Sequence, residues 1–584
     1  MSDIMKSIPF GQLMEWILSE YKNTGQVFGI QKAYVADQSK TIEIFGRKLE
    51  NPVGPAAGPH TQLAQNLVAA YVAGARFFEL KTVQKMDGPE LSACVPKPCI
   101  VAEDEAYNCE WSTELYVPQA MEEYIKGWIL IHVIAKEFGL GSPDGFQFNM
   151  SCGYNLEGIK DKKIDDFIEG MKDAGDTAIF KECKQWLREH ISLFEHVTKE
   201  DIEAIPAEIC NSITLSTMHG CPPQEIENIV MYLLKEKHIN TYVKCNPTLL
   251  GYEFVRKAMD DLGYDYMAFT DFHFKDDLQY EDAVPMLKRL LETAAQEGLS
   301  FGVKLTNTFP VDIKRQELPG EEMYMSGKAL FPLSISVAAR LAESFDGKLP
   351  MSFSGGADQK NIDQIVDCGI WPVTVATVLL KPGGYKWMTK IAEKADDCEI
   401  GKCGEVQVET LKKLAEDSLT DAHYRKTGRK AAGKHTEEKS PLLDCLKKND
   451  VGEKKEFTRH KRVCGNCADV CPNRANVLIE VPDMELLQIL HVDYMCNECG
   501  NCRSFCQYAG APYKDKFTLF ATEEDMKDST NNGFTVLDAE TKCVLVRIGD
   551  REETVKADHP EGILTESLGR LICTVIDNYR YLFM

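Results

Sequence analysis

Residues 51–58, Asn-Pro-Val-Gly-Pro-Ala-Ala-Gly, open the pattern that decides the fold. This stretch is short and apolar and ends in small residues, as a buried strand does where it runs into a loop. Similar stretches recur along the chain and alternate with amphipathic helices such as 224–237 and 283–297. Alternating strands and helices over this length predict an α/β fold, a parallel sheet closed as a (β/α)8 TIM barrel.

Nine stretches are candidates for the eight strand positions of the barrel. They are 51–57, 77–83, 146–151, 213–218, 242–247, 266–272, 302–308, 351–355 and 373–379. One of them must therefore belong to an insertion, and we expect it among 242–247, 266–272 and 302–308.

Further elements are expected on both sides of the barrel. A helix over 12–21 and a strand over 41–45 that turns at Gly46 should precede it. Near the C-terminus, Asn531-Asn532-Gly533 is a hairpin signal with strands near Val536 and Val544, and a helix over 565–581 should close the chain.

Two cysteine runs lie near the C-terminus. The first is Cys464-x2-Cys467-x3-Cys471-Pro472, and the second is Cys496-x2-Cys499-x2-Cys502-x3-Cys506. The second run has the spacing of a two-cluster ferredoxin, in which three cysteines hold one [4Fe–4S] cube and the fourth reaches the other. Paired Cys-x2-Cys also occurs in zinc sites, but these rarely show the longer run beside a Cys-Pro. The runs therefore predict two [4Fe–4S] clusters.

The first cysteine run is one ligand short. By the crossing rule, one cluster takes a four-cysteine set, Cys471, Cys496, Cys499 and Cys502. The other cluster keeps a three-cysteine set, Cys464, Cys467 and Cys506.

The missing ligand would fall at Lys461, which cannot bind iron while it is protonated. His460 and Cys445 are possible substitutes, since histidine replaces cysteine in some iron–sulfur centres. A three-iron cluster is a further possibility, and the sequence leaves the three open.

Five segments follow from these patterns. They are an N-terminal helix and hairpin (1–50), the barrel (51–396), a polar basic connector (397–462), a ferredoxin-like module (463–512) and an α+β extension (513–584).

Composition excludes some classes of function. The net charge of −24 argues against nucleic acid as a partner. No signal-like segment or membrane span is apparent, and 21 cysteines without a secretion signal indicate metal use in a reducing compartment. We therefore expect a cytoplasmic protein that does not bind membranes.

Polar and glycine-rich residues follow the predicted strands, where barrel enzymes place their active sites. Lysines occur there as Lys81, Lys244 and Lys304. The pairs Gly355-Gly356 and Ala376-Thr377 follow the last two strands, which is the usual phosphate cradle of such barrels.

These residues resemble the FMN barrel of the dihydroorotate and dihydropyrimidine dehydrogenase superfamily, over about 51–392. The resemblance implies FMN contacts from Ala56, Ala57, Lys81, Thr82, Lys244, Lys304, Gly355, Gly356, Ala376 and Thr377. Lys244 resembles the lysine that faces the flavin, and Lys304 is its rival.

The same resemblance implies substrate contacts from Asn155, Asn307 and Thr308. Cys221 resembles the mobile-loop cysteine that acts as general acid, with His219 beside it as an alternative donor.

The whole chain resembles a family named as a selenate reductase iron–sulfur and flavin subunit. The stretch 471–476, Cys-Pro-Asn-Arg-Ala-Asn, and the start of the second cysteine run carry this resemblance. Long members insert an FAD- and NAD(P)H-binding module before the cysteines. Here the connector is too short for it, and no Gly-x-Gly-x-x-Gly is present. The resemblance therefore implies a separate FAD/NAD(P)H-binding flavoprotein subunit as partner.

The expected function is that of an oxidoreductase subunit in a multi-subunit complex. Electrons would pass from the partner through the clusters to FMN, to reduce a C=C or C=N bond of a purine- or pyrimidine-like ring amide. The alternative is a non-catalytic relay or scaffold subunit for a molybdenum- or selenium-dependent hydroxylase or reductase.

Overall fold

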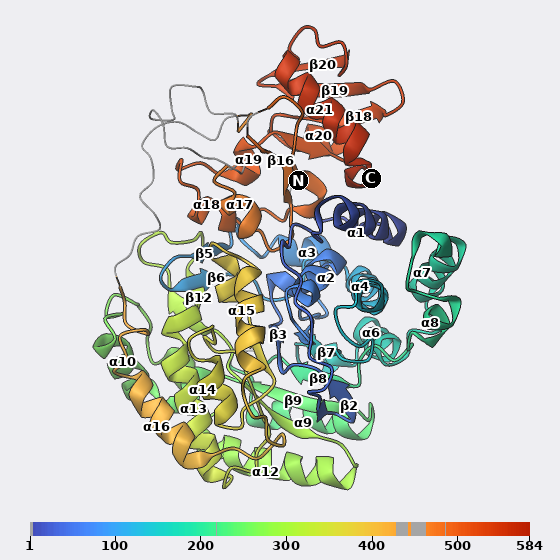
Figure 1. Ribbon diagram of the computed structural model, residues 1–584. Coiled ribbons are helices and arrows are strands. Elements are labelled where there is room, and N and C mark those ends of the chain that lie inside the picture. The colour runs from blue at the N-terminus through green and yellow to red at the C-terminus, as the bar shows by residue number, and fades with distance from the viewer. Residues whose placement is uncertain (1–3, 218, 428–441, 445–462, 485) are drawn as a thin grey trace. The chain divides into compact units, whose positions relative to one another are not determined.

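The computed structural model describes residues 4–217, 219–427, 442–444, 463–484 and 486–584 (Figure 1). The chain folds into two compact units. The barrel unit comprises 32–379 and 385–428, and the C-terminal unit comprises 1–31, 380–384 and 429–584. None of the helices within these described ranges is both long and apolar enough to cross a bilayer.

Eight parallel strands form the core of the barrel unit, in the neighbour order β3-β14-β13-β10-β9-β8-β7-β4. Their bounds are β3 Val53–Pro55, β4 Phe77–Glu79, β7 Gln147–Cys152, β8 Ser212–Leu215, β9 Asn240–Cys245, β10 Phe301–Leu305, β13 Met351–Phe353 and β14 Val373–Val375. The two outer strands meet, because the Arg76 N–H donates to the Val53 carbonyl over 2.9 Å. The predicted α/β barrel is confirmed.

Eight of the nine predicted strands are the barrel strands. The ninth, 266–272, forms only an isolated bridge, between Ala268 and Asp312, outside the barrel sheet. The surplus strand thus lies within the group of three in which it was expected.

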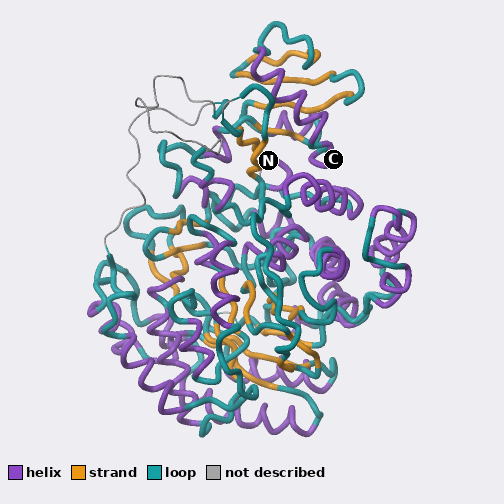
Figure 2. The backbone as a smooth tube through the Cα atoms, in the orientation of Figure 1, coloured by secondary structure: helices purple, strands orange, loops and turns teal. Residues whose placement is uncertain are grey.

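Helices surround the barrel strands, as Figure 2 shows in purple around orange. Their bounds are α2 Ala64–Val72, α4 Val117–Glu137, α6 Lys162–Lys172, α7 Ala178–Glu189, α9 Pro223–Lys235, α10 Tyr252–Asp261, α12 Tyr280–Gln296, α13 Phe331–Ser344, α14 Ile362–Asp367, α15 Lys386–Ala395 and α16 Val408–Ser418. Helix α16 belongs to the stretch predicted as a connector, and it packs on α13.

A second sheet is inserted at the barrel's C-terminal end, and the sequence analysis did not predict it. Its four antiparallel strands run in the order β11-β12-β6-β5. They are β5 Ile100–Ala102, β6 Ala106–Asn108, β11 Phe309–Asp312 and β12 Glu322–Ser326. Because these strands follow β4 and β10, they bring further polar residues to the edge where a barrel active site forms.

The C-terminal unit contains helix α1 (Phe10–Thr24), a six-stranded sheet and helix α21 (Glu566–Asn578). The sheet runs β15 to β20 in chain order. Its strands are β15 Asn476–Ile479, β16 Gln488–Val492, β17 Thr518–Phe520, β18 Gly533–Asp538, β19 Cys543–Ile548 and β20 Arg551–Lys556. The predicted N-terminal and C-terminal helices are both present.

The two predicted turns have different outcomes. Strand β1 (Ile42–Ile44) turns at Phe45 and Gly46 into β2 (Arg47–Leu49), as expected. The hairpin predicted at Asn531-Asn532-Gly533 is wrong, because these residues join the parallel strands β17 and β18. The true hairpin turn lies at 539–542, between β18 and β19.

Closure of the barrel depends on Gly54. A Cβ atom at this position of β3 would lie 1.6 Å from the Phe77 carbonyl oxygen of β4. The two strands can therefore approach only where no side chain intervenes.

We expect Gly54→Ala to destabilise the barrel by about 3 kcal/mol or more, because the clash is with backbone that cannot rotate away. Thermal unfolding followed by circular dichroism measures the loss. Gly401→Ala is the matched control, since a Cβ there meets nothing within 4 Å. Equal melting temperatures for the two variants would contradict the proposed role of Gly54.

Candidate functional site

Lys304 lies in the centre of the barrel and ties four strands together. Its Nζ is 2.6 Å from Thr374 Oγ1, 2.9 Å from Glu79 Oε2 and 3.1 Å from Ser352 Oγ. Both charged side chains are buried. Burial lowers the pKa of Lys304 to about 8, against the opposing effect of Glu79. The Lys304 ammonium is thus fully used in an ion pair and hydrogen bonds to the neighbouring strands.

Lys244, the rival lysine, has a different environment. Its side chain has no hydrogen bond or ion pair within the described ranges, and it lines a small cavity at the ends of β8 and β9 together with Thr217, Cys221 and Asn246. Burial lowers the pKa of Lys244, although Glu79 opposes this effect. Of the two candidate lysines, Lys244 is therefore the one that no carboxylate holds in an ion pair within the described residues.

Asp277, which no sequence pattern indicated, organises the loop that carries Cys221. Its buried carboxylate accepts hydrogen bonds from His219 Nδ1 at 2.9 Å, the Gly220 N–H at 2.8 Å and Thr248 Oγ1 at 2.7 Å. Asn246 Nδ2 is a further donor at 3.0 Å. Burial would raise the pKa of Asp277, but the hydrogen bond from His219 and the other donors hold it below its usual value.

The two predicted substrate asparagines have different roles in the structure. Asn307 Nδ2 donates to Asn246 Oδ1 at 2.7 Å, so Asn307 extends the polar network around Asp277. Asn155 is exposed, and its Oδ1 accepts the Gly158 N–H as the N-cap of helix α5 (Leu156–Ile159). Thr308 is partly exposed just beyond β10. Of the three, only Asn307 joins the network that borders the cavity.

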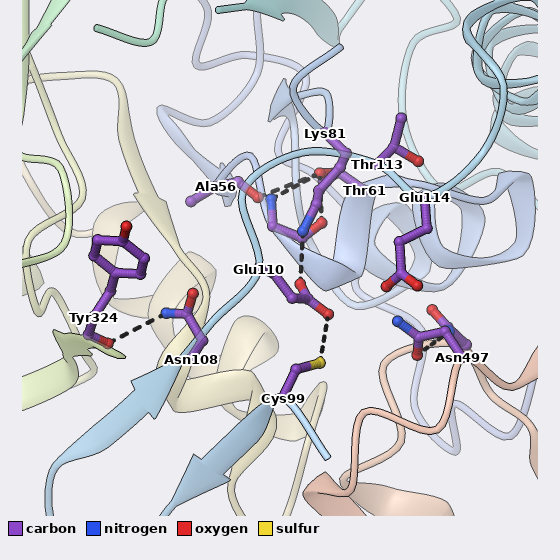
Figure 3. A network of polar contacts seen from close by, with 12 residues as sticks. Ala56, Thr61, Lys81, Cys99, Asn108, Glu110, Thr113, Glu114, Tyr324 and Asn497 are labelled. Atoms are coloured by element: carbon purple, nitrogen blue, oxygen red, sulfur yellow. Dashed lines mark hydrogen bonds and ion pairs between the residues drawn. The ribbon is translucent and has the colours of Figure 1, made fainter. Parts of the chain in front are cut away.

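Lys81 follows β4 and forms a buried ion pair with Glu110, 2.6 Å away (Figure 3). The other oxygen of Glu110 accepts from Cys99 Sγ at 3.5 Å. Burial would raise the pKa of Glu110, but the charges of Lys81 and Lys97 outweigh this effect. The pKa of Glu110 therefore lies below its usual value. The neighbouring Thr82 shares a 2.7 Å hydrogen bond with Ser151 on β7. Both predicted cofactor residues thus lie at the strand ends within fixed polar contacts.

In the predicted phosphate cradle, the backbone N–H groups of Gly355 and Gly356 already donate to carbonyl groups of the protein. The N–H of Gly355 donates to the Leu305 carbonyl at 3.2 Å, and that of Gly356 to the Ser354 carbonyl at 2.8 Å. A Cβ at Gly355 would lie 1.8 Å from Ser334 Oγ of helix α13, so close helix packing already requires this glycine.

The other predicted backbone contacts lie at the same end of the barrel. Ala56 donates its N–H to Val375, and its carbonyl accepts from Thr61 at 3.3 Å (Figure 3). Ala57 is the next residue in the chain. At the end of β14, Ala376 is followed by Thr377, whose Oγ1 lies 2.9 Å from Ser326 Oγ.

His219, His273 and Asp277 bring ligand atoms within 4.8 Å of one another. A metal would have to displace the hydrogen bonds that saturate Asp277, and His273 already contacts Glu322 at 2.7 Å. The hydrogen bond that His273 Nε2 donates to the Glu322 carboxylate raises the pKa of His273. This group therefore works as a hydrogen-bonded network and is a poor metal site.

The seven predicted iron ligands of the two runs line two cavities in the C-terminal unit. The four-cysteine set lines one of them. The three-cysteine set lines the other. This division matches the crossing rule of two-cluster ferredoxins. His460 and Cys445 lie outside the described residues.

The surroundings of the four-cysteine set suit bound cations. Backbone N–H groups of Ala475 and Glu498 donate to Cys471 Sγ and Cys496 Sγ, each over 3.3 Å. Burial raises the pKa of Cys496 and of Cys502 well above the usual range of a thiol. Such thiols ionise only when a cation binds them, which is how thiolates hold iron.

The residues fit an iron–sulfur cluster in the chemistry of their donors. Four thiols line one cavity and three line the other, and thiolates are the ligands of [4Fe–4S] clusters.

Comparison with known families identifies the barrel unit. A family model described as "Oxidoreductase YgfK, N-terminal TIM-barrel domain" matches residues 28–426. The chain belongs to this family. Its description agrees with the predicted TIM barrel and with the predicted enzyme class, oxidoreductase.

Relatives of this YgfK-family chain include proteins of Escherichia coli strains K12 and O157:H7 named "Putative oxidoreductase YgfK". Each is 47% identical over 459 residues, which cover 76% of this chain and 44% of the relative. The chain thus spans less than half the length of these relatives. A crystal structure of DHODH from Eimeria tenella in complex with ferulenol is similar with a TM-score of 0.37 and 15% identity, over 66% of this chain and 88% of that one.

We expect Lys304→Met to destabilise the barrel by about 3–5 kcal/mol, because it leaves the buried Glu79 carboxylate without its partner. Lys244→Met should change stability by less than about 1 kcal/mol, since it breaks no ion pair. The apparent melting temperatures of the two variants measure the contrast. Equal destabilisation by both would contradict the different roles assigned to these lysines.

We expect Cys221 to react slowly with iodoacetamide near neutral pH. Burial, reinforced by Glu225 and Asp277, raises the pKa of Cys221 to about 11. Only the thiolate reacts, and at pH 8 a thiol of this pKa is almost entirely protonated. Alkylation of Cys221 at pH 8 should therefore be roughly 100-fold slower than that of an ordinary thiol. Peptide mass spectrometry over a pH series measures the rates, with exposed Cys94 as internal control. Equal rates at the two cysteines at pH 8 would contradict the raised pKa.

Proposed function

We propose that this YgfK-family chain is the iron–sulfur and FMN subunit of an NAD(P)H-linked reductase complex. The observation that carries the proposal is the division of seven cysteines into cavities of four and three, in a chain whose barrel belongs to an oxidoreductase family. Iron–sulfur clusters carry single electrons. A flavin bound in the barrel would turn pairs of such electrons into hydride transfer to the substrate.

Lys244 is the residue proposed to face the flavin, because its ammonium is unpaired within the described residues and lines the cavity. Lys304 would support the site through the strands. Since the Gly355 and Gly356 amides already donate to carbonyls, phosphate binding would rely more on the neighbouring Ala376-Thr377 turn. Ala56, Ala57, Lys81 and Thr82 would form the opposite wall.

Cys221 is the proposed proton donor. Its thiol shares the cavity with Lys244, and its raised pKa keeps it protonated at neutral pH. The substrate bond that gains hydride at one atom would take the Cys221 proton at the other, and the resulting thiolate would recover a proton from water. Asp277 acts as a positioning residue, because it fixes His219 and the Gly220 backbone immediately before Cys221.

The proposed substrate is a conjugated ring amide, purine- or pyrimidine-like. Amides match the paired donor and acceptor of such a ring edge. Asn246 and Asn307 are the amides nearest the cavity, and a ring edge would have to exchange with the hydrogen bonds that they now make to each other and to Asp277. A separate FAD/NAD(P)H-binding subunit would deliver the electrons. The resemblance to proteins named as a selenate reductase subunit supports a multi-subunit complex, but that name does not define the substrate.

Anaerobic purification of the full chain tests the proposal. We expect stoichiometric FMN together with iron and labile sulfide. Iron without any FMN, even after reconstitution, would contradict the reductase and favour the relay subunit of a molybdenum- or selenium-dependent enzyme. Zinc in place of iron would contradict both.

The same preparation tests the proton donor. With reduced FMN bound, Cys221→Ala should slow reduction of ring-amide substrates by about 100-fold, while flavin content stays unchanged. Cys94→Ala is the control, because Cys94 is exposed and lies outside the cavity. Full activity in Cys221→Ala would show that another group, such as His219, gives the proton.

A further inference from the structure

The cavity of the three-cysteine set contains a carboxylate that can bind iron. Its wall includes Asp444, Ile489, Tyr508 and Lys516 besides the three cysteines. Asp444 is the one carboxylate among the described residues that line it. A carboxylate side chain thus lines the same space as three cysteines, at the proposed cluster that lacks a fourth cysteine.

Asp444 is held in this position by contacts to strand β16. Its backbone N–H donates to Gln488 Oε1 at 2.8 Å, and its Oδ2 accepts the Ile489 N–H at 2.9 Å. Its Oδ1 contacts Lys516 Nζ. The side chains of Asp444 and Lys516 are only 10% and 4% exposed. The carboxylate is therefore desolvated and oriented, as a metal ligand must be.

We propose that Asp444 is the fourth protein ligand of the cluster held by Cys464, Cys467 and Cys506. The inference rests on the proposed function, since it presupposes that cluster. Three thiolates leave one iron of a cube without a protein donor, and a carboxylate oxygen is an established type of iron ligand. Lys516 would hydrogen-bond the ligating carboxylate and balance its charge, while the Ile489 N–H fixes its orientation.

This assignment accounts for the short first cysteine run. The crossing rule leaves the first ligand position at Lys461, where the sequence offered His460 and Cys445 as substitutes. Asp444 is a third choice, and sequence reasoning passed over it because carboxylates are not part of the cysteine spacing rule. The burial of its side chain and its contacts with β16 support it.

Iron analysis and electron paramagnetic resonance of the anaerobically purified full chain test the proposal. Wild-type protein should hold roughly eight irons in two cubes. Asp444→Ala should lose about one of them and give the signal of an oxidised three-iron cluster. Asp444→Cys should restore the full iron count, because a thiolate replaces the carboxylate. Cys445→Ala and His460→Ala are the matched controls, and each should keep the wild-type count.

The outcomes separate this proposal from the proposed function. Wild-type iron content in Asp444→Ala overturns the assignment, as does loss of one iron in Cys445→Ala or His460→Ala alone. Either result leaves the two clusters and the reductase standing. Wild-type protein without iron overturns the clusters themselves, and with them both proposals. If Asp444→Ala does not fold, the iron count of Asp444→Cys decides: a three-iron cluster in that variant also overturns the assignment.

Discussion

The buried ion pair between Lys304 and Glu79 is the constraint on which the barrel depends. Taking both charges out of water costs several kcal/mol per ion, and only close geometry with additional hydrogen bonds offsets that cost. Thr374, Ser352 and the Phe353 carbonyl supply these bonds to Lys304. Because the contacts come from β4, β10, β13 and β14, one ammonium fixes the relative positions of half of the barrel strands.

That constraint decides which lysine can serve a ligand. Sequence resemblance made Lys244 and Lys304 rivals, since both follow hydrophobic strand residues and both fit the pattern of a flavin-facing lysine. The distinction lies in their partners. Glu79 forms its ion pair with Lys304 and acts on Lys244 only at longer range. No spacing rule reports which of two neighbouring cations the single carboxylate will hold, so only the three-dimensional structure separates them.

Much of the fold could be predicted because it follows from local patterns. The barrel strands are short, apolar and spaced by helices, and the cysteine spacing assigned seven sulfurs to two cavities. The failures have physical reasons. The Asn531-Asn532-Gly533 signal marks a turn of any kind, and here it leads from helix α20 (Glu523–Asp528) into β18, within the connection between the parallel strands β17 and β18. Asp277 lies far in sequence from Cys221, so nothing near Cys221 points to it. Asp444 lies next to the candidate Cys445, but a carboxylate is not part of the cysteine spacing rule.

Burial favours bound cations in the C-terminal unit and a bound anion in the barrel unit. Both preferences are compatible with the proposed electron transfer. In the C-terminal unit, burial raises the pKa of Cys496 and Cys502, so ionised thiolates there require bound cations. In the barrel unit, burial lowers the pKa of Lys244, so its charged form is stabilised by an anion. In the proposed reductase, an electron that reached the barrel would add negative charge beside Lys244. Because a low-dielectric cavity strengthens that attraction, Lys244 would then favour the reduced state of the redox group.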